Sequence, residues 1–117
     1  MPPEVMALLY DIQKAANLAR KFTEGKSFAE YQTDDLLHSA VERQFEIVGE
    51  AMTQLRKRDS SLAERFTDYR AIIAFRNLLI HGYAAIVHEK VWDIIENKLP
   101  TLIVEVDAVC VSLTPTT

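Results

Sequence analysis

Apolar residues recur along most of the chain at the spacing of three and four positions that marks a helix with one buried face. In the first segment, residues 3–23, the apolar stripe contains Val5, Leu8, Leu9, Ile12, Ala15, Ala16, Ala19 and Phe22. Gly25 follows at a position where helices commonly end. The run Thr33-Asp34-Asp35 then offers an N-cap and an acidic first turn. The pattern predicts a first helix over residues 3–23 and a second that begins near residue 35.

The second predicted helix extends to about Lys57. Its apolar seam consists of Leu37, Val41, Phe45, Val48, Met52 and Leu55. The polar run 59–61 breaks the pattern and leads into a short amphipathic piece at 62–66. A third long helix is predicted over residues 68–80, apolar on most sides, and it should end at His81 and Gly82 because glycine commonly follows a helix end.

The last predicted helix runs from His88 to Leu113. Its seam keeps one phase through Trp92, Ile95, Leu99, Leu102, Val106, Val109 and Leu113. Pro100 falls inside this seam, which favours a kinked helix over two separate ones. Since no segment alternates like a half-buried strand, we predict an all-α, antiparallel four-helix-type bundle with a short extra helix. Residues 1–113 should form this single domain, with 114–117 as a short tail.

Composition agrees with one globular domain. The chain has 117 residues, of which 49% are hydrophobic, and only three glycines, so a disordered or collagen-like protein is excluded. The single cysteine, Cys110, excludes an internal disulfide framework and a cysteine-based zinc site, and we expect it to be packed. The chain begins without the basic and apolar stretches of a signal peptide, so a cytoplasmic location is expected.

The charge is unevenly distributed. A net charge of −4 argues against a protein that coats nucleic acid. Residues 54–76, however, carry six Lys or Arg against three Asp or Glu, a local excess of +3 in a chain that is otherwise −7. This region is either a solvated helix end or a patch that contacts phosphates. The candidate phosphate contacts are Arg56, Lys57, Arg58 and Arg70.

Polar residues interrupt the most apolar helix at its end, in the run Arg76-Asn77-Leu78-Leu79-Ile80-His81-Gly82-Tyr83. Asn77 and His81 are four positions apart, so the amide can orient the imidazole. Arg76 and His81 are separated by about 140° around an ideal helix. They can act on one target only if the helix ends or bends near His81, or if a second copy completes the site across a twofold axis. Tyr83 lies just beyond, where its hydroxyl can reach the same place.

These residue types suit cleavage of an RNA phosphodiester. Histidine moves protons near neutral pH, and arginine clamps a phosphate and stabilises charge that develops on its oxygens. This chemistry requires neither metal nor cofactor, and the sequence shows no cluster of metal ligands. The structural alternative is that His81 caps the last carbonyls of its helix while Arg76 pairs with a nearby carboxylate.

Other polar residues are weaker candidates. One side of the second helix carries Glu42, Arg43, Glu46 and Glu50, which either support the motif or form a solvated or dimer-contacting face. His38 and His88 are expected at the surface. Trp92 is expected to anchor the core or a dimer contact.

The run Arg76-x4-His81-x-Tyr83 resembles the RX4-6H motif of HEPN-domain proteins, in the RX4HXY form of the HepT-type toxins. The likeness extends over about residues 5–110. It includes the stretches Val41-Glu42-Arg43 and Glu46-Ile47-Val48-Gly49-Glu50-Ala51 before the motif, and Val91-Trp92-Asp93 and Leu99-Pro100 after it.

The resemblance implies an all-α HEPN fold that dimerises, with two motifs facing one cleft. It implies a metal-independent endoribonuclease toxin that cleaves RNA with Arg76 and His81 as the catalytic pair, supported by Asn77 and Tyr83. It also implies a partner, a nucleotidyltransferase antitoxin of the MNT type, which neutralises the toxin by AMPylation of Tyr83. The alternative is a non-catalytic HEPN module that binds such a nucleotidyltransferase.

Overall fold

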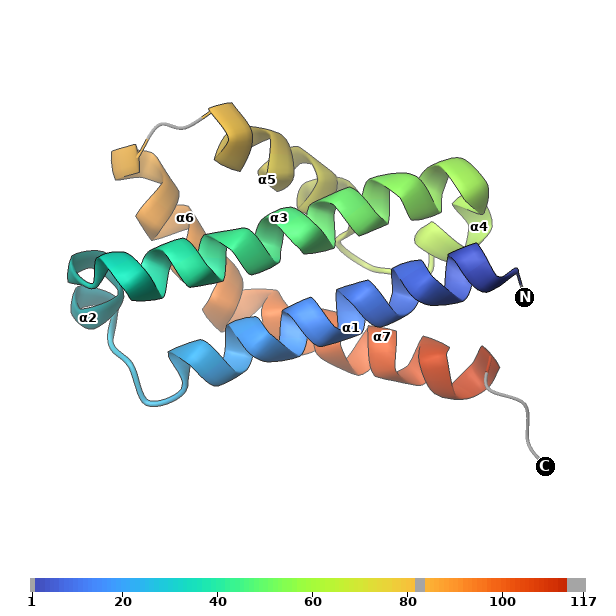
Figure 1. Cartoon of the computed structure of the whole chain (residues 1–117), viewed down its shortest axis with the longest axis horizontal. Coiled ribbons are helices and arrows are strands. Elements are labelled where there is room, and N and C mark those ends of the chain that lie inside the picture. Colours follow the sequence, from blue (N-terminus) through green and yellow to red (C-terminus); the bar gives the residue numbers. More distant parts are fainter. Residues whose placement is uncertain (1, 82–83, 114–117) are drawn as a thin grey trace.

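The computed structural model describes residues 2–81 and 84–113, and in this part of the chain every regular element is a helix (Figure 1). The helices are α1 (Pro3–Thr23), α2 (Phe28–Thr33), α3 (Asp35–Arg58), α4 (Ser60–Ala63), α5 (Tyr69–His81), α6 (Ala84–Asn97) and α7 (Leu99–Leu113). The predicted all-α bundle is confirmed. The predicted tail, residues 114–117, lies outside the described residues. No described helix combines the length and apolar character needed to cross a bilayer.

The centre of the bundle is formed by α1, α3 and α7. In Figure 1, α1 lies antiparallel to α3 on one side and to α7 on the other. The apolar stripes predicted for these segments face one another, so Leu9, Met52 and Val106 are fully buried. Burial of these stripes is the main favourable term for the fold. The expected packing of Cys110 is confirmed, since this residue is also buried.

Local signals in the sequence set the helix ends. The Asp34 carboxylate accepts a hydrogen bond from the Leu37 backbone N–H at 3.0 Å and caps α3, as predicted. Gly25 adopts a φ of +72° after α1, a conformation that strongly favours glycine. The sequence analysis missed α2, which is too short to show a period. Its capping box was nevertheless readable, because Ser27 and Glu30 each accept a hydrogen bond from the other's backbone N–H.

The single kinked helix predicted for residues 88–113 is wrong. Helix α6 starts earlier, at Ala84, and ends at Asn97, and α7 begins anew at Leu99. Pro100 has no N–H to donate to the carbonyl of residue 96, and its ring crowds that carbonyl, so the helical ladder is interrupted. At the second position of α7 the missing donor costs little. The two helices therefore run in different directions in Figure 1, although the apolar seam continues from one to the other.

Helix α5 has α3 as its main packing partner. Two polar contacts fix the segment that leads into it: the Thr67 hydroxyl donates to the Glu105 carboxylate at 2.7 Å, and Lys98 pairs with Asp68 at 3.2 Å. An open cavity of about 340 Å³ separates α5 from α6 and α7. Its apolar lining includes Phe45, Ile72, Phe75, Leu78, Ile94 and Leu102. One side of α5 is therefore only partly covered.

Candidate active site on helix α5

Arg76 lies at the contact between α5 and α3. Its Nη2 atom is 2.7 Å from Oε2 of Glu50, and its Nη1 atom donates a long hydrogen bond of 3.5 Å to Oδ1 of Asn77. The Arg76 side chain is 29% exposed and that of Glu50 is 49% exposed. The structural alternative for Arg76 is thus correct in that a carboxylate partner exists. A guanidinium has five N–H donors, so this pairing leaves donors available for a phosphate.

Gly49 permits this arrangement. A Cβ atom built at Gly49 would overlap Cβ of Arg76 and would lie 3.0 Å from its Cγ. Any larger residue at this position would push α3 and α5 apart at the level of Arg76. The pair Gly49 and Glu50 therefore does two things: the glycine lets the arginine approach, and the glutamate orients its guanidinium. Glu50 belongs to the polar set on one side of this helix that was predicted as possible support for the motif.

His81 is the last residue of α5, and its side chain is exposed. No described residue forms a hydrogen bond or ion pair with its imidazole, so the ring is accessible to a substrate or to a second chain. The Asn77 oxygen contacts Arg76, and no hydrogen bond joins that amide to His81 in the described part of the chain. Within one chain, Arg76 and His81 remain on different sides of the helix, about 140° apart. Tyr83 lies outside the described residues.

The four residues predicted to contact phosphates lie near the other end of α5. Arg56, Lys57 and Arg58 are exposed in the last turn of α3, where they complement the negative end of the helix dipole. Arg70 is exposed at the start of α5, and its Nε donates to the Tyr69 hydroxyl at 2.8 Å. Because α3 and α5 run antiparallel (Figure 1), these four cations share one end of the helix pair, on the side of Arg76 away from His81. Arg70 precedes Arg76 by six residues, or about 9 Å of helix.

Two expectations about single side chains had different outcomes. Trp92 packs against Phe28 and Tyr31, with ring centroids 6.1 and 5.6 Å apart, which confirms its role as a core anchor. The surface placement of His38 and His88 is wrong. Their rings lie 4.4 Å apart between α3 and α6, and both residues are partly buried. Fifty residues separate the two histidines, so no local pattern in the sequence indicates this contact.

Comparison with known proteins identifies the family of the chain. The family model described as "Ribonuclease HepT-like" matches residues 12–109, which include Glu50, Arg76 and His81. The chain belongs to the HepT-like ribonuclease family. The family resemblance that the motif predicted is therefore confirmed.

The relatives cover nearly all of the HepT-like chain. A protein of Methanocaldococcus jannaschii named "Putative RNase MJ1380" is 32% identical over 108 residues, covering 91% of this chain and 96% of the relative. A second protein of the same organism, "Putative RNase MJ0127", is 33% identical. The match covers 91% of this chain and 87% of that relative. "Probable ribonuclease HepT" of Thermococcus cleftensis is 29% identical and covers 80% and 84%. No solved structure matches the chain at a significant level.

The close approach at Gly49 yields a prediction with an unusual sign. Gly→Ala in a helix normally stabilises by up to about 1 kcal/mol, but Gly49→Ala should destabilise by about 1–3 kcal/mol because the added methyl overlaps Arg76. Urea unfolding followed by circular dichroism measures the difference. Ser39→Ala, at an exposed position of the same helix, is the control and should change stability little. A Gly49→Ala protein as stable as the wild type would contradict the close approach.

Proposed function

We propose that this protein is a metal-independent endoribonuclease toxin of a toxin–antitoxin pair. Arg76 and His81 would cleave RNA in a cleft between two copies of the chain, and AMPylation of Tyr83 by a nucleotidyltransferase antitoxin would inhibit it. The observation that carries the proposal is the state of the two side chains. The His81 imidazole is exposed without a partner among the described residues, and the Arg76 guanidinium is held by Glu50 with donors to spare. Family membership and the relatives named as RNases support the RNA substrate.

The reaction follows from these two groups. His81, as general base, takes the proton of a ribose 2′-hydroxyl, and the 2′ oxygen attacks the adjacent phosphorus. The bond from phosphorus to the 5′ oxygen breaks, and that oxygen leaves with a proton from solvent. Arg76 binds the non-bridging oxygens and stabilises the negative charge that grows on them. The products are a 2′,3′-cyclic phosphate and a 5′-hydroxyl.

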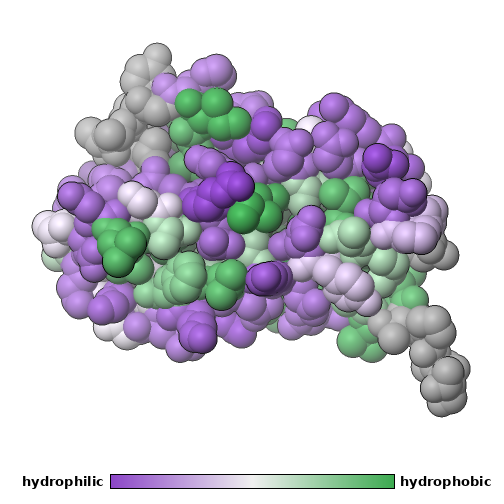
Figure 2. Space-filling view, viewed as in Figure 1, coloured by the Kyte–Doolittle hydropathy of each residue, from purple (hydrophilic) through white to green (hydrophobic). Residues whose placement is uncertain are grey.

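A second copy of the chain would bring the two groups together. Arg76 and His81 of one chain point to different sides of α5, so one helix aims only one of them at a given phosphate. Helix α5 also carries apolar surface suited to burial. Ile80 is 52% exposed beside His81, and a hydrophobic patch over α5 is one of several on the face shown in Figure 2. A twofold contact through this end of α5 would place Arg76 of one chain near His81 of the other.

The basic end of the helix pair would hold the RNA strand. Arg56, Lys57, Arg58 and Arg70 are exposed at the end of the α3–α5 pair that lies away from His81. Contacts from such side chains to phosphates supply affinity without reading sequence. The local excess of positive charge thus lets an acidic protein bind RNA in one place.

The second candidate is a non-catalytic module that binds a nucleotidyltransferase. The ion pair between Arg76 and Glu50 favours it, because a paired arginine at a helix contact is also what a purely structural role requires. Activity measurements distinguish the two candidates.

The proposed reaction predicts the products of RNA cleavage and the effect of removing each catalytic group. The purified protein should cut RNA without added metal and leave 2′,3′-cyclic phosphate ends, and an RNA with 2′-deoxyribose at the cleavage position should resist. His81→Ala should reduce the rate by about 10²- to 10⁴-fold, the usual contribution of a general base. Arg76→Ala should also be impaired, and Arg20→Ala, at an exposed position of α1, is the arginine control. End analysis by mass spectrometry identifies the products. Wild-type protein that cuts no RNA, or products with 5′-phosphates, would contradict the proposed reaction.

The shared cleft predicts complementation between two inactive variants. Arg76→Ala and His81→Ala chains, refolded together, form mixed dimers that contain one intact Arg76–His81 pair across the interface. A 1:1 mixture should regain roughly a quarter of wild-type activity, since half the dimers are mixed and each has one of two pairs. Mixing His81→Ala with the double variant is the control and should regain nothing. If the first mixture stays inactive, or if light scattering shows a monomer at micromolar concentration, the shared cleft is wrong.

Inhibition by AMPylation predicts a modification at Tyr83. The phenolic oxygen would attack the α-phosphorus of ATP on the antitoxin, releasing pyrophosphate and adding a bulky anionic group that repels RNA phosphates. Co-expression with a nucleotidyltransferase antitoxin should add the mass of one adenylyl group to the peptide containing Tyr83. Tyr83→Phe should escape this modification, whereas Tyr10→Phe, on α1, should still be modified. An unmodified wild-type protein from active co-expression would contradict this regulation.

A further inference from the structure

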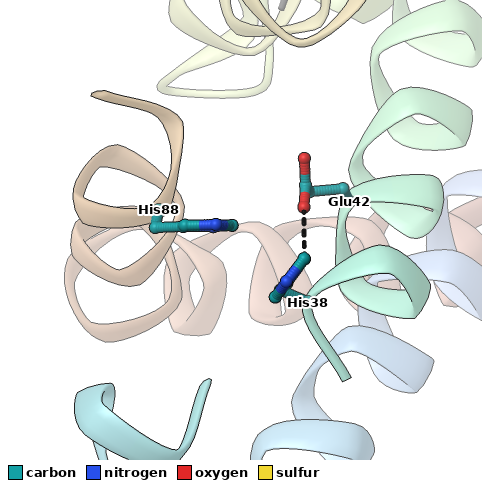
Figure 3. Close-up of side chains that lie close together, drawn as sticks. All are labelled: His38, Glu42 and His88. Atoms are coloured by element: carbon teal, nitrogen blue, oxygen red, sulfur yellow. Dashed lines mark hydrogen bonds and ion pairs between the residues drawn. The ribbon is translucent and has the colours of Figure 1, made fainter. Parts of the chain in front are cut away.

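Three side chains of the types that bind transition metals gather between α3 and α6, apart from the proposed catalytic pair. They are His38, Glu42 and His88 (Figure 3). One ring nitrogen of each histidine and one carboxylate oxygen of Glu42 lie within 4.8 Å of one another. His38 and Glu42 are four residues apart on α3 and share a face. His88 projects toward them from α6, so the cluster joins two helices.

Two buried polar atoms at this place have no hydrogen-bond partner within the described residues. They are Nδ1 of His88 and the hydroxyl of Tyr31, from α2. The Tyr31 ring lies 5.7 Å from that of His88 and 6.1 Å from that of His38. A buried polar atom without a partner costs on the order of 1–3 kcal/mol. Two such atoms on neighbouring rings point to a polar or charged ligand that satisfies them.

The hydrogen bonds of His38 fit a metal ligand. Its Nε2 lies 3.2 Å from Oδ1 of Asp35, and its Nδ1 lies 3.2 Å from Oε2 of Glu42. A carboxylate that holds one ring nitrogen orients the other toward a metal, which is the usual outer arrangement of zinc-bound histidine. The separation of Nδ1 from Oε2 is also close to the distance of about 3.3 Å between neighbouring ligands of tetrahedral zinc. With Nε2 protonated toward Asp35, Nδ1 is a lone pair facing a carboxylate, and a cation between them removes the repulsion.

The chemistry of the donor set favours a transition metal such as zinc. Two imidazoles and one carboxylate suit zinc, whereas magnesium and calcium prefer oxygen ligands. Burial and the nearby Glu42 charge raise the pKa of the Tyr31 phenol above its usual range, so this group remains an O–H donor. It is therefore suited to donate a hydrogen bond to Glu42 or to a water on the metal.

We propose that His38, Glu42 and His88 bind one zinc ion, with Asp35 orienting His38 and a water as the fourth ligand. The ion ties α6 to α3 through His88, which follows His81 by seven residues in the chain. None of its ligands belongs to the proposed catalytic pair, so the zinc site stands or falls independently of the proposed reaction.

Zinc binding to the full chain, purified without a histidine tag and stripped with a chelator, tests the site. Zinc is then added, and the excess is removed by gel filtration. Elemental analysis should find one zinc per chain, and bound zinc should raise the Tm by several degrees. Cobalt, as a spectroscopic substitute, should give the visible absorption of a tetrahedral site. His38→Gln and His88→Gln should each weaken zinc binding by 100-fold or more. The remaining histidine of the chain provides the control, because His81→Gln should bind zinc like the wild type.

A second variant keeps the test informative if a ligand variant fails to fold. Asp35 is fully exposed, so Asp35→Asn should preserve the fold while it weakens zinc binding by about 10- to 100-fold. Circular dichroism verifies folding in each case. Less than a tenth of an equivalent of zinc on the folded wild type, or equal zinc on wild type and His88→Gln, would overturn the proposal. Loss of zinc binding in His81→Gln, with zinc retained by the ligand variants, would also overturn the proposal.

Discussion

The contact between α5 and α3 at Arg76 determines where every candidate catalytic group lies. Helix α5 has α3 as its main neighbour, and Gly49 of α3 leaves room for the Arg76 side chain. The Glu50 carboxylate then holds the guanidinium at 2.7 Å. An ion pair this exposed contributes at most about 1 kcal/mol to stability. Its main effect is therefore on geometry: it selects one orientation of a long, flexible side chain.

This same contact explains why Arg76 fits two interpretations. A structural arginine and a phosphate-binding arginine both need a fixed guanidinium, and Glu50 supplies it for either purpose. The difference lies in what the remaining donors meet. Arg76 retains partial exposure, so a phosphate that approaches it meets a guanidinium already oriented by Glu50. A core arginine would instead have its donors satisfied inside the protein.

Sequence patterns predicted the parts of the fold that depend on local physics. Long stripes defined α1, α3 and α5, and Asp34 and Gly25 marked ends where side-chain capping or positive φ acts within a few residues. Helix α2 escaped because six residues give too little periodicity, although its capping box was present. The motif residues were found because polar side chains in an apolar helix are costly to bury. The contact of Arg76 with Glu50 could be anticipated only as a type, since its partner depends on how two helices pack.

The error at Pro100 and the error at the histidines have one cause. A single helix over residues 88–113 would continue along α7, whereas the break at Lys98 lets α6 turn away and bring His88 and Trp92 against α2 and α3. Tyr31 of the short helix α2 is buried where these rings meet, so α6 packs against α2 at this residue. The chain thus enters the His-Gly-Tyr sequence from a helix fixed to α3 through Arg76. It leaves into a helix fixed through His88 and Trp92. His81 is therefore the last residue of a helix anchored to α3, which limits the positions that its imidazole can occupy.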